Sequence, residues 1–523
     1  MNKNLLLAIL SGIFFTIGWP TFGFPIFLFF AFVPLLIIEE SYLDKTANKS
    51  FFLNIYLAFF IWNLLKTWWI YNSTAVGGIF AIVVNSWLMA TTFWLFHFVR
   101  KRLPDRMALF FFPAIWIAFE KFHLNWDFSW PWLNLGNGFS EYPAWIQWYT
   151  YTGAFGGALW ILIVNILFYK TLSIYWNNKN RKQLFASVLK VVGWIVIPVV
   201  ISFFIKQTYQ ERGATAKVLI LQPNLDPWED KFHYNNTQLT DNLLALVQQP
   251  ADVIVAPETA LSQYTELNDF AYSRPYHILH EFAKQHHTAI VTGVDFIHWY
   301  PKNLKDIPDT ANKTSRGRWY DMYNSAVLID STKGFGVYHK SKLVVGAEYT
   351  PFKSILVPLI GDWVTETIGV SMGSNVSQDE RSVFDAGNGL RVAPIICYES
   401  IYGEYVTQYV HKGANLLAVI TNDGWWGNTE GHRQHLSIAR LRALENRRDL
   451  VQSANTGISA HINQKGEVVK SLGYNKRGSI LTSVHLNNQP TFYATYGDYI
   501  AGAAIFMAVL LFLYSFARKK VRL

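Results

Sequence analysis

Long apolar runs fill the first 206 residues of the chain and return only near its end. A helix needs about 20 mostly apolar residues to cross the hydrocarbon layer of a membrane. The pattern predicts eight such helices, at 4–19, 24–39, 51–70, 75–99, 107–121, 155–176, 184–205 and 496–517. We therefore predict a membrane domain over 1–206, a second domain over 207–495, and a final membrane helix with a basic tail over 496–523.

In the region between the last two apolar runs, short β-branched segments alternate with helical patterns. Strands are predicted at 217–224, 252–259, 288–296, 324–330, 391–399, 415–423 and 450–457, and helices at 235–249, 275–286 and 432–448. This alternation favours an α/β domain, and near-continuous apolar strands are typical of a sheet that is covered on its faces.

The composition supports a membrane protein, because 51% of residues are hydrophobic, 17% are aromatic and only 15% are charged. Lys and Arg near span ends stay on the cytoplasmic side. With the N-terminus inside, the internal flanks carry 14 Lys and Arg against four Asp and Glu, so their net charge of +10 accounts for the +9 of the whole chain. We predict cytoplasmic termini, an outward-facing domain over 207–495, and no nucleic-acid-binding surface.

Polar residues follow three of the predicted strands. They are Glu258 in "VIVAPET", Cys397 in "APIICYES", and Asn422 with Asp423 in "AVITNDGWWG", while Lys340 lies in "YHKSKLVVGAEYTPF". Sites of α/β folds form just past the carboxyl ends of strands. Cys397 is the only cysteine and cannot form an internal disulfide, so it is either a buried packing thiol or a reactive one.

A reactive thiol needs a base and a positive group that stabilises negative charge. No histidine lies in the Cys397 motif, so a carboxylate and an ammonium would have to serve. Taken singly, Glu258 could cap a helix and Lys340 could be a surface charge. The histidines of "GHRQH", His432 and His435, have no partner cluster and favour a structural role, so we expect no metal and no other cofactor.

Together, the motifs "APET", "YHKSKL" and "ICYE", followed by "TNDGWWG" and "RALENRRDLVQSANTG", resemble the nitrilase or carbon–nitrogen hydrolase superfamily, whose triad is Glu-Lys-Cys. Within it, "PWLNLGN" (131–137), residues 434–459 and the predicted topology are similar to the apolipoprotein N-acyltransferase family. The resemblance covers essentially the whole chain. It implies a polytopic α-helical membrane domain and an extracytoplasmic nitrilase-like αββα sandwich.

The resemblance also implies roles for individual residues. Glu258 would be the general base, Cys397 the nucleophile that carries an acyl group as a thioester, and Lys340 the cation that stabilises the tetrahedral intermediate. The implied supporting or substrate-binding residues are Trp228, Glu348, Tyr398 and Glu399. The family usually reads Val-Pro-Phe-Gly-Glu before the second glutamate, whereas this chain reads "VVGAE" (344–348), which leaves the conformation of that loop open.

The implied reaction moves an acyl chain from a phospholipid, typically phosphatidylethanolamine, to the α-amino group of a diacylglyceryl-modified N-terminal cysteine of an apolipoprotein. Both partners would lie in the outer leaflet of the bacterial inner membrane, and we expect a monomer. Two alternatives remain open, a membrane-tethered amidase or nitrilase that hydrolyses a small C–N bond, and a transporter with an extracytoplasmic lid. The Trp-rich segment 122–154 is either an interfacial anchor or a lipid-handling lid.

Overall fold

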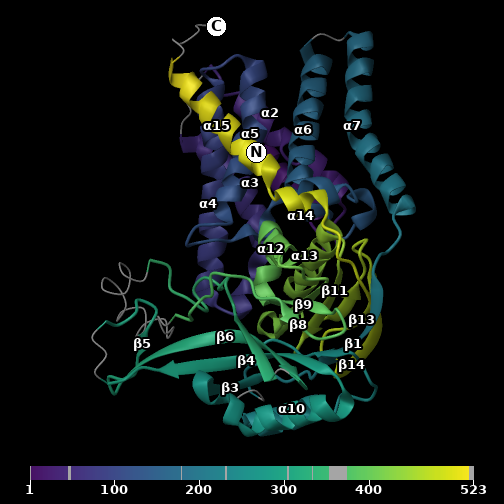
Figure 1. Cartoon of the computed structure of the whole chain (residues 1–523). Coiled ribbons are helices and arrows are strands. Elements are labelled where there is room, and N and C mark those ends of the chain that lie inside the picture. Colours follow the sequence, from purple (N-terminus) through teal and green to yellow (C-terminus); the bar gives the residue numbers. More distant parts are fainter. Residues whose placement is uncertain are drawn as a thin grey trace. The chain divides into compact units, whose positions relative to one another are not determined.

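The computed structural model describes residues 2–44, 49–177, 180–229, 233–302, 306–332, 334–352 and 374–517. The chain divides into two compact units (Figure 1). We call residues 1–209 with 496–523 the helical unit and residues 210–495 the α/β unit. The predicted basic tail, 518–523, and the flanking Lys45 and Lys179 lie outside the described residues.

The helical unit consists of α-helices joined by short 3₁₀ helices. Its elements are α1 (Lys3–Gly18), η1 (Pro25–Phe29), α2 (Val33–Glu40), α3 (Lys49–Thr67), η2 (Trp68–Asn72), α4 (Ala75–Arg100), α5 (Asp105–His123), η3 (Pro131–Leu133), η4 (Leu135–Phe139), η5 (Pro143–Trp145), α6 (Tyr149–Asn177), α7 (Arg181–Thr208) and α15 (Tyr499–Ala517).

Five helical segments in the described part of the chain are long and apolar enough to cross a membrane. They are Lys49–Asn72, Ala75–Arg100, Tyr149–Trp176, Arg181–Thr208 and Tyr499–Ala517. The predicted span at 4–19 corresponds to α1, which has only 16 residues. The span at 107–121 corresponds to α5, which has 19 residues and contains Pro113. The chain therefore has several apolar membrane helices, and the number eight stays a prediction.

The predicted span at 24–39 is not one helix. A 3₁₀ helix, η1, ends at Phe29, and α2 begins at Val33. Pro34 fits the first turn of α2, because a backbone N–H at that position has no acceptor within the helix. Asn165 of α6 satisfies the broken backbone, because it accepts from the Phe32 amide at 2.8 Å and donates to the Leu28 carbonyl at 2.8 Å. Irregular backbone at membrane depth is tolerated when other protein groups pair with it.

The Trp-rich segment folds into η3, η4 and η5 of the helical unit. The side chains of Trp132 and Leu135 are buried there, and the Leu135 amide donates to Glu120 Oε1 at 2.8 Å. Tyr149 closes the segment by donating to the Gly136 carbonyl at 2.9 Å. These contacts leave both readings of the segment, anchor and lid, as predictions.

The α/β unit contains most of the strands and the shorter helices. Its elements are β1 (Ala214–Gln222), α9 (Asn236–Leu244), β2 (Val253–Val255), β3 (Leu261–Glu266), η6 (Leu267–Tyr272), α10 (Arg274–His286), β4 (Ala289–Trp299), β5 (Asn312–Lys313), β6 (Trp319–Asp330), β7 (Gly334–His339), β8 (Phe384–Asp385), β9 (Arg391–Ile396), η7 (Cys397–Ile401), α12 (Gly403–His411), β10 (Leu416–Thr421), η8 (Asp423–Trp426), α13 (Glu430–Asn446), β11 (Asp449–Ala454), β12 (Ser459–Ile462), β13 (Val468–Leu472), β14 (Gly478–Leu486) and the boundary helix α14 (Phe492–Tyr496).

The described strands form two sheets that pack face to face. The eight-stranded sheet runs β14-β1-β2-β4-β6-β5, with β3 beside β4 and β7 beside β6, and the six-stranded sheet runs β13-β12-β11-β10-β9-β8. Strands β1, β2 and β4 are parallel, as are β9, β10 and β11. Helices α9 and α10 cover the first sheet, and α12 and α13 cover the second (Figure 1). The order of layers is therefore helix, sheet, sheet, helix.

All seven predicted strands correspond to strands in the structure, namely β1, β2, β4, β6, β9, β10 and β11. The parallel ones are apolar over their whole length because both faces are covered; β10, for example, is buried at every position. The predicted helices correspond to α9, α10 and α13. The shorter peripheral strands β3, β5 and β8 lacked a long enough apolar pattern to be predicted.

Candidate active site

The structure brings the nominated triad together inside the α/β unit. Glu258 lies three residues past the end of β2, Lys340 directly follows β7, and Cys397 directly follows β9. The Lys340 ammonium lies 3.0 Å from Glu258 Oε1 and is almost fully buried. The thiol of Cys397 interacts electrostatically with both of these side chains. Three residues that are up to 139 positions apart thus share one site.

Lys340 contacts a second carboxylate as well. Its Nζ lies 2.9 Å from Glu348 Oε1, and Glu348 Oε2 accepts from the Val344 amide at 2.7 Å. Gly346 permits the tight turn between them, since its φ is +76°. The unusual "VVGAE" sequence therefore folds into a loop that returns Glu348 to the lysine.

Asn324 of β6 connects the two carboxylates. Its side-chain nitrogen, Nδ2, donates to Glu258 Oε1 and to Glu348 Oε1, both at 2.8 Å. Its backbone carbonyl accepts from the backbone N–H of Lys340 at 2.8 Å. One strand residue thus fixes the lysine backbone and both acidic side chains. Sequence reasoning did not identify Asn324, although an Asn at a predicted strand position is a signal because Asn is depleted in strands.

The turn that carries Glu258 is fixed by close backbone contact. The Asn422 amide donates to Glu258 Oε2 at 3.1 Å. On the other side, a Cβ on Gly293 of β4 would lie only 2.3 Å from the Thr259 nitrogen and 2.7 Å from the Glu258 Cα. Only glycine therefore lets β4 approach the turn at this point.

Cys397 has a left-handed backbone conformation, with φ of +49°. This conformation costs an L-residue other than glycine about 1–2 kcal/mol, so neighbouring contacts have to hold it. The carbonyl of Cys397 accepts from Ser400 Oγ at 2.8 Å and lies 3.1 Å from His435 Nε2. Cys397 as a whole residue is partly exposed.

Two opposing influences act on the proton of the thiol. Burial and the charge of Glu258 raise the pKa of Cys397 well above its ordinary value, whereas Lys340 and a hydrogen bond with Thr421 lower it. For Lys340, burial lowers the pKa, but Glu258 and Glu348 raise it well above its ordinary value. The resting site therefore holds a neutral thiol and a charged ammonium, and a base must take the thiol proton when the sulfur attacks.

Glu399 lies beneath the site and acts as a structural anchor. Its Oε1 accepts from the Tyr338 and Tyr405 hydroxyls, both at 2.6 Å, and from the Ser341 amide at 2.7 Å, while Oε2 accepts from the Ile396 amide at 2.8 Å. Burial, partly offset by these donors, raises its pKa above the ordinary value. Glu399 thus ties the lysine loop to the strand that precedes the cysteine.

Tyr398 and Trp228 lie in contrasting surroundings. Tyr398 is buried, and its ring meets the edge of Tyr402 with the centroids 5.4 Å apart. Trp228 is 56% exposed and meets Trp425 edge to face at 4.7 Å. Asn455 joins the chain just before Trp228 to the Glu258 site, because it accepts from the Leu225 amide at 3.1 Å and donates to Asn422 at 3.2 Å. The substrate-binding role of Trp228 stays a prediction.

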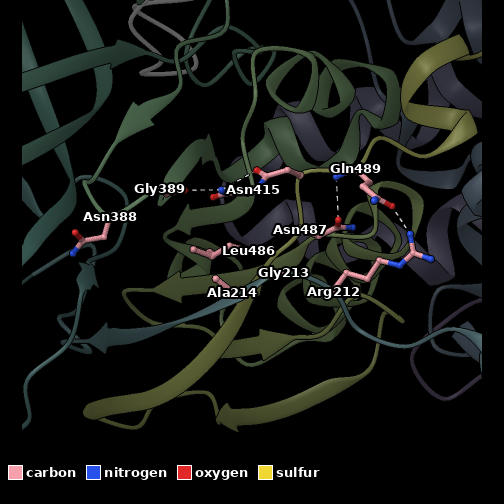
Figure 2. Close-up of a pocket in the computed structure, with 10 residues that line it drawn as sticks. Arg212, Gly213, Ala214, Asn388, Gly389, Asn415, Leu486, Asn487 and Gln489 are labelled. Carbon is pink, nitrogen blue, oxygen red and sulfur yellow. Dashed lines mark hydrogen bonds between the residues drawn. The ribbon is translucent and has the colours of Figure 1, made fainter.

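Other features of the α/β unit do not take part in this site. A polar cavity of about 350 Å³ is lined by Arg212, Asn415, Gln489 and their neighbours, and by none of the nominated residues (Figure 2). Its amides join chain segments, since Asn415 donates to the Gly389 carbonyl at 2.8 Å. Among the described residues, no group of three His, Cys, Asp or Glu side chains could hold a metal ion.

Comparisons with known proteins relate the chain to two families. The family model described as carbon–nitrogen hydrolase matches residues 218–489, and the model for the apolipoprotein N-acyltransferase N-terminal domain matches residues 11–167. An amidase structure from Nesterenkonia sp. is 18% identical, with a TM-score of 0.35, and the match covers 56% of this chain and 97% of the amidase.

Two relatives match over nearly their full length. "Apolipoprotein N-acyltransferase" of Chlorobaculum tepidum is 27% identical, covering 99% of this chain and 98% of the relative. The protein of the same name from Geobacter metallireducens is 26% identical, covering 99% and 96%. Since the first family model spans more than half of the sequence and includes all three triad positions, the chain belongs to the carbon–nitrogen hydrolase family.

Proposed function

We propose that this protein is a phospholipid:apolipoprotein N-acyltransferase that works through a thioester on Cys397. The observation that carries the proposal is the Cys397 thiol, on a partly exposed residue, in the field of a buried Glu258–Lys340 pair. Full-length relatives with the acyltransferase name, together with several membrane helices, favour lipid substrates over soluble ones.

In the first half-reaction, the Cys397 sulfur attacks the ester carbonyl carbon of the phospholipid while Glu258 takes the thiol proton. The negative charge that develops on the carbonyl oxygen is stabilised by the Lys340 ammonium. The C–O bond then breaks, Glu258 returns the proton to the leaving oxygen, and a lysophospholipid departs. The products are a thioester on Cys397 and a carboxylate at Glu258.

In the second half-reaction, the α-amino group of the diacylglyceryl-modified cysteine attacks the thioester carbonyl. Glu258 removes a proton from the attacking nitrogen, the C–S bond breaks, and the proton passes to the sulfur. An amide and a neutral thiol result, so the enzyme returns to its starting state. Water has to be kept from the thioester between the two steps.

The variant Glu258→Gln distinguishes a general base at Glu258 from a residue that only supports the structure. The charge of Glu258 raises the pKa of the Cys397 thiol. Without that charge, more of the thiol should be ionised at pH 8, so iodoacetamide should alkylate Cys397 faster. Acyl-enzyme formation should nevertheless fall by about 10²–10⁴-fold because the base is lost. Mass spectrometry of the full-length protein in detergent, after mixing with phosphatidylethanolamine alone, measures the adduct.

The matched control is Glu281→Gln, which alters an exposed carboxylate of α10 and should leave both rates unchanged. Cys397→Ala should give no adduct. An adduct-free wild-type enzyme that still acylates a diacylated lipopeptide would contradict the thioester mechanism. Release of ammonia from small amides without any lipid would contradict the acyltransferase and favour an amidase.

A further inference from the structure

A buried ion pair lies directly behind the peptide of the nucleophile. His435 Nδ1 of α13 is 3.0 Å from Asp423 Oδ1 of η8, and both side chains are fully buried. The other ring nitrogen, Nε2, is 3.1 Å from the Cys397 carbonyl oxygen and 2.9 Å from Ser400 Oγ. An imidazole with acceptors at both nitrogens is matched by its doubly protonated form, which donates from both.

The acidic partner is itself fixed from the strand next to the cysteine. Thr421, the last residue of β10, donates to Asp423 Oδ1 at 2.7 Å, and its hydroxyl is one of the groups that lower the pKa of the Cys397 thiol. A closed set of contacts thus runs from the thiol through Thr421, Asp423 and His435 back to the Cys397 carbonyl. This set encloses the residue whose backbone is left-handed, at φ of +49°.

We infer that the Asp423–His435 pair is a positioning device for the nucleophile, which holds the Cys397 carbonyl and thereby fixes the turn that keeps the thiol beside Glu258 and Lys340. The pair also balances charge. Asp423 raises the pKa of the Cys397 thiol. We expect an imidazolium 3.0 Å from that carboxylate to reduce this effect. His435 acts through the backbone, because its Nε2 contacts the carbonyl oxygen.

The surroundings of His435 favour its protonated form. Burial lowers its pKa, but Asp423, the Cys397 carbonyl and Glu258 raise it, and the net value lies above the ordinary one. From η7 it meets the Ser400 hydroxyl, and from η8 the edge of the Trp426 ring at 5.8 Å. This direction agrees with the hydrogen-bond geometry, in which both ring nitrogens of His435 face acceptors.

The test is the pH profile of iodoacetamide alkylation in the full-length protein in detergent. Cys397 is the only cysteine, so the signal belongs to it alone. In His435→Ala, the charge of Asp423 has no imidazolium beside it, and the turn at Cys397 loses a hydrogen bond. The pH at which alkylation reaches half its maximal rate should therefore rise by about one unit. Such a shift slows alkylation at pH 8 about tenfold. His435→Gln should recover part of the rate, since its amide can still donate to the carbonyl.

A second buried pair supplies the matched control. His461 Nε2 lies 3.1 Å from Asp449 Oδ2 between β12 and β11, away from the cysteine. His461→Gln should lower the thermal unfolding midpoint comparably and leave the alkylation profile in place. The inference is overturned if His435→Ala alkylates like wild type, or if its profile moves no further than that of His461→Gln.

This inference rests on the proposed function only for a second readout, acyl-enzyme formation, which His435→Ala should reduce at least tenfold. If the wild-type enzyme forms no acyl adduct with phospholipid, the proposed function fails. The alkylation profiles would still decide the role of His435, because they require no lipid substrate.

Discussion

At the scale of single residues, the site is dominated by an excess of negative charge. Lys340 is one cation between two carboxylates, Glu258 and Glu348, at 3.0 and 2.9 Å. Breaking such a buried pair by removing one member is costly because it leaves an unpaired charge. Burial, together with the charge of Glu258, raises the pKa of the Cys397 thiol well above its ordinary value, so the sulfur needs Glu258 to take its proton when it attacks.

His339, next to Lys340, provides a pH prediction at this scale. Its Nδ1 lies 2.7 Å from Ser325 Oγ, and burial lowers its pKa to about 4. In the unfolded chain the imidazole takes up a proton below about pH 6.5, whereas in the folded protein it stays neutral down to about pH 4. The unfolded state therefore binds more protons in this window, and stability should fall as the pH drops from 6.5 to 4.

The check is thermal unfolding of wild type and His339→Gln in detergent between pH 4.5 and 7.5. The variant should lose less of its stability on acidification, so the gap between the two curves should narrow toward low pH. Parallel curves would contradict the assignment of this acid sensitivity to His339.

At the scale of elements, the carboxyl ends of parallel strands explain why the site forms where it does. Strands β9 and β10 place Cys397 and Asn422 at one edge of their sheet, and β2 places Glu258 at an edge of the facing sheet. The Asn422 amide then binds Glu258 across the two sheets. The β7 hairpin adds Lys340, and Asn324 of its partner strand β6 fixes the lysine.

Gly293→Ala tests how closely β4 must approach the Glu258 turn. The added Cβ would collide with backbone atoms of Thr259 and Glu258 at 2.3 and 2.7 Å, so the turn has to shift. A misplacement of about 1 Å can cost about 10²-fold in rate. We therefore expect acyl-enzyme formation to fall by at least tenfold, measured by mass spectrometry.

The control for this change is Gly336→Ala in β7. Its new Cβ would meet only the Phe384 ring, at an ordinary contact distance of 3.6 Å. This variant should keep its rate within about threefold of wild type. Equal losses of rate in the two variants would show that any added methyl group disturbs the sheet. The loss in Gly293→Ala could then not be assigned to the contact at Glu258.

At the scale of the whole molecule, the expected topology rests on hydropathy and on the charges near the span ends. Some of these charged side chains also form buried ion pairs within the helical unit. Arg100, counted among the cytoplasmic flanks, is buried and pairs with Glu39. His97 adds a contact to the same carboxylate at 2.7 Å. These groups join α2 to α4, yet their position near span ends still fits the positive-inside rule.

We expect the α/β unit to face the periplasm and the first turn of α5 to face the cytoplasm. In a Cys397→Ser background, Lys476→Cys should react with a membrane-impermeant maleimide in intact spheroplasts, and Arg106→Cys should react only after permeabilisation. Both positions are exposed, so access to the label depends on the side of the membrane. The reverse pattern, or labelling of both, would contradict the proposed orientation.

The sequence by itself determined the features that depend on local pattern. Apolar runs indicated apolar helices and β-branched runs indicated seven strands. Polar residues after strands drew attention to Glu258 and Cys397, and the resemblance of the ordered motifs to a known family added Lys340. These signals are readable because each arises from residues that are close in the chain.

Only the tertiary structure decided which distant groups meet. Asn324 contacts Glu258 from 66 positions away and His435 contacts Cys397 from 38, and neither separation leaves a mark on the local pattern. The break between η1 and α2 was likewise hidden, because Asn165 satisfies that backbone from 133 residues further on. Such partners come together when whole layers of helices and strands pack. A hydrogen bond between them therefore depends on the fold and not on the local sequence around either residue.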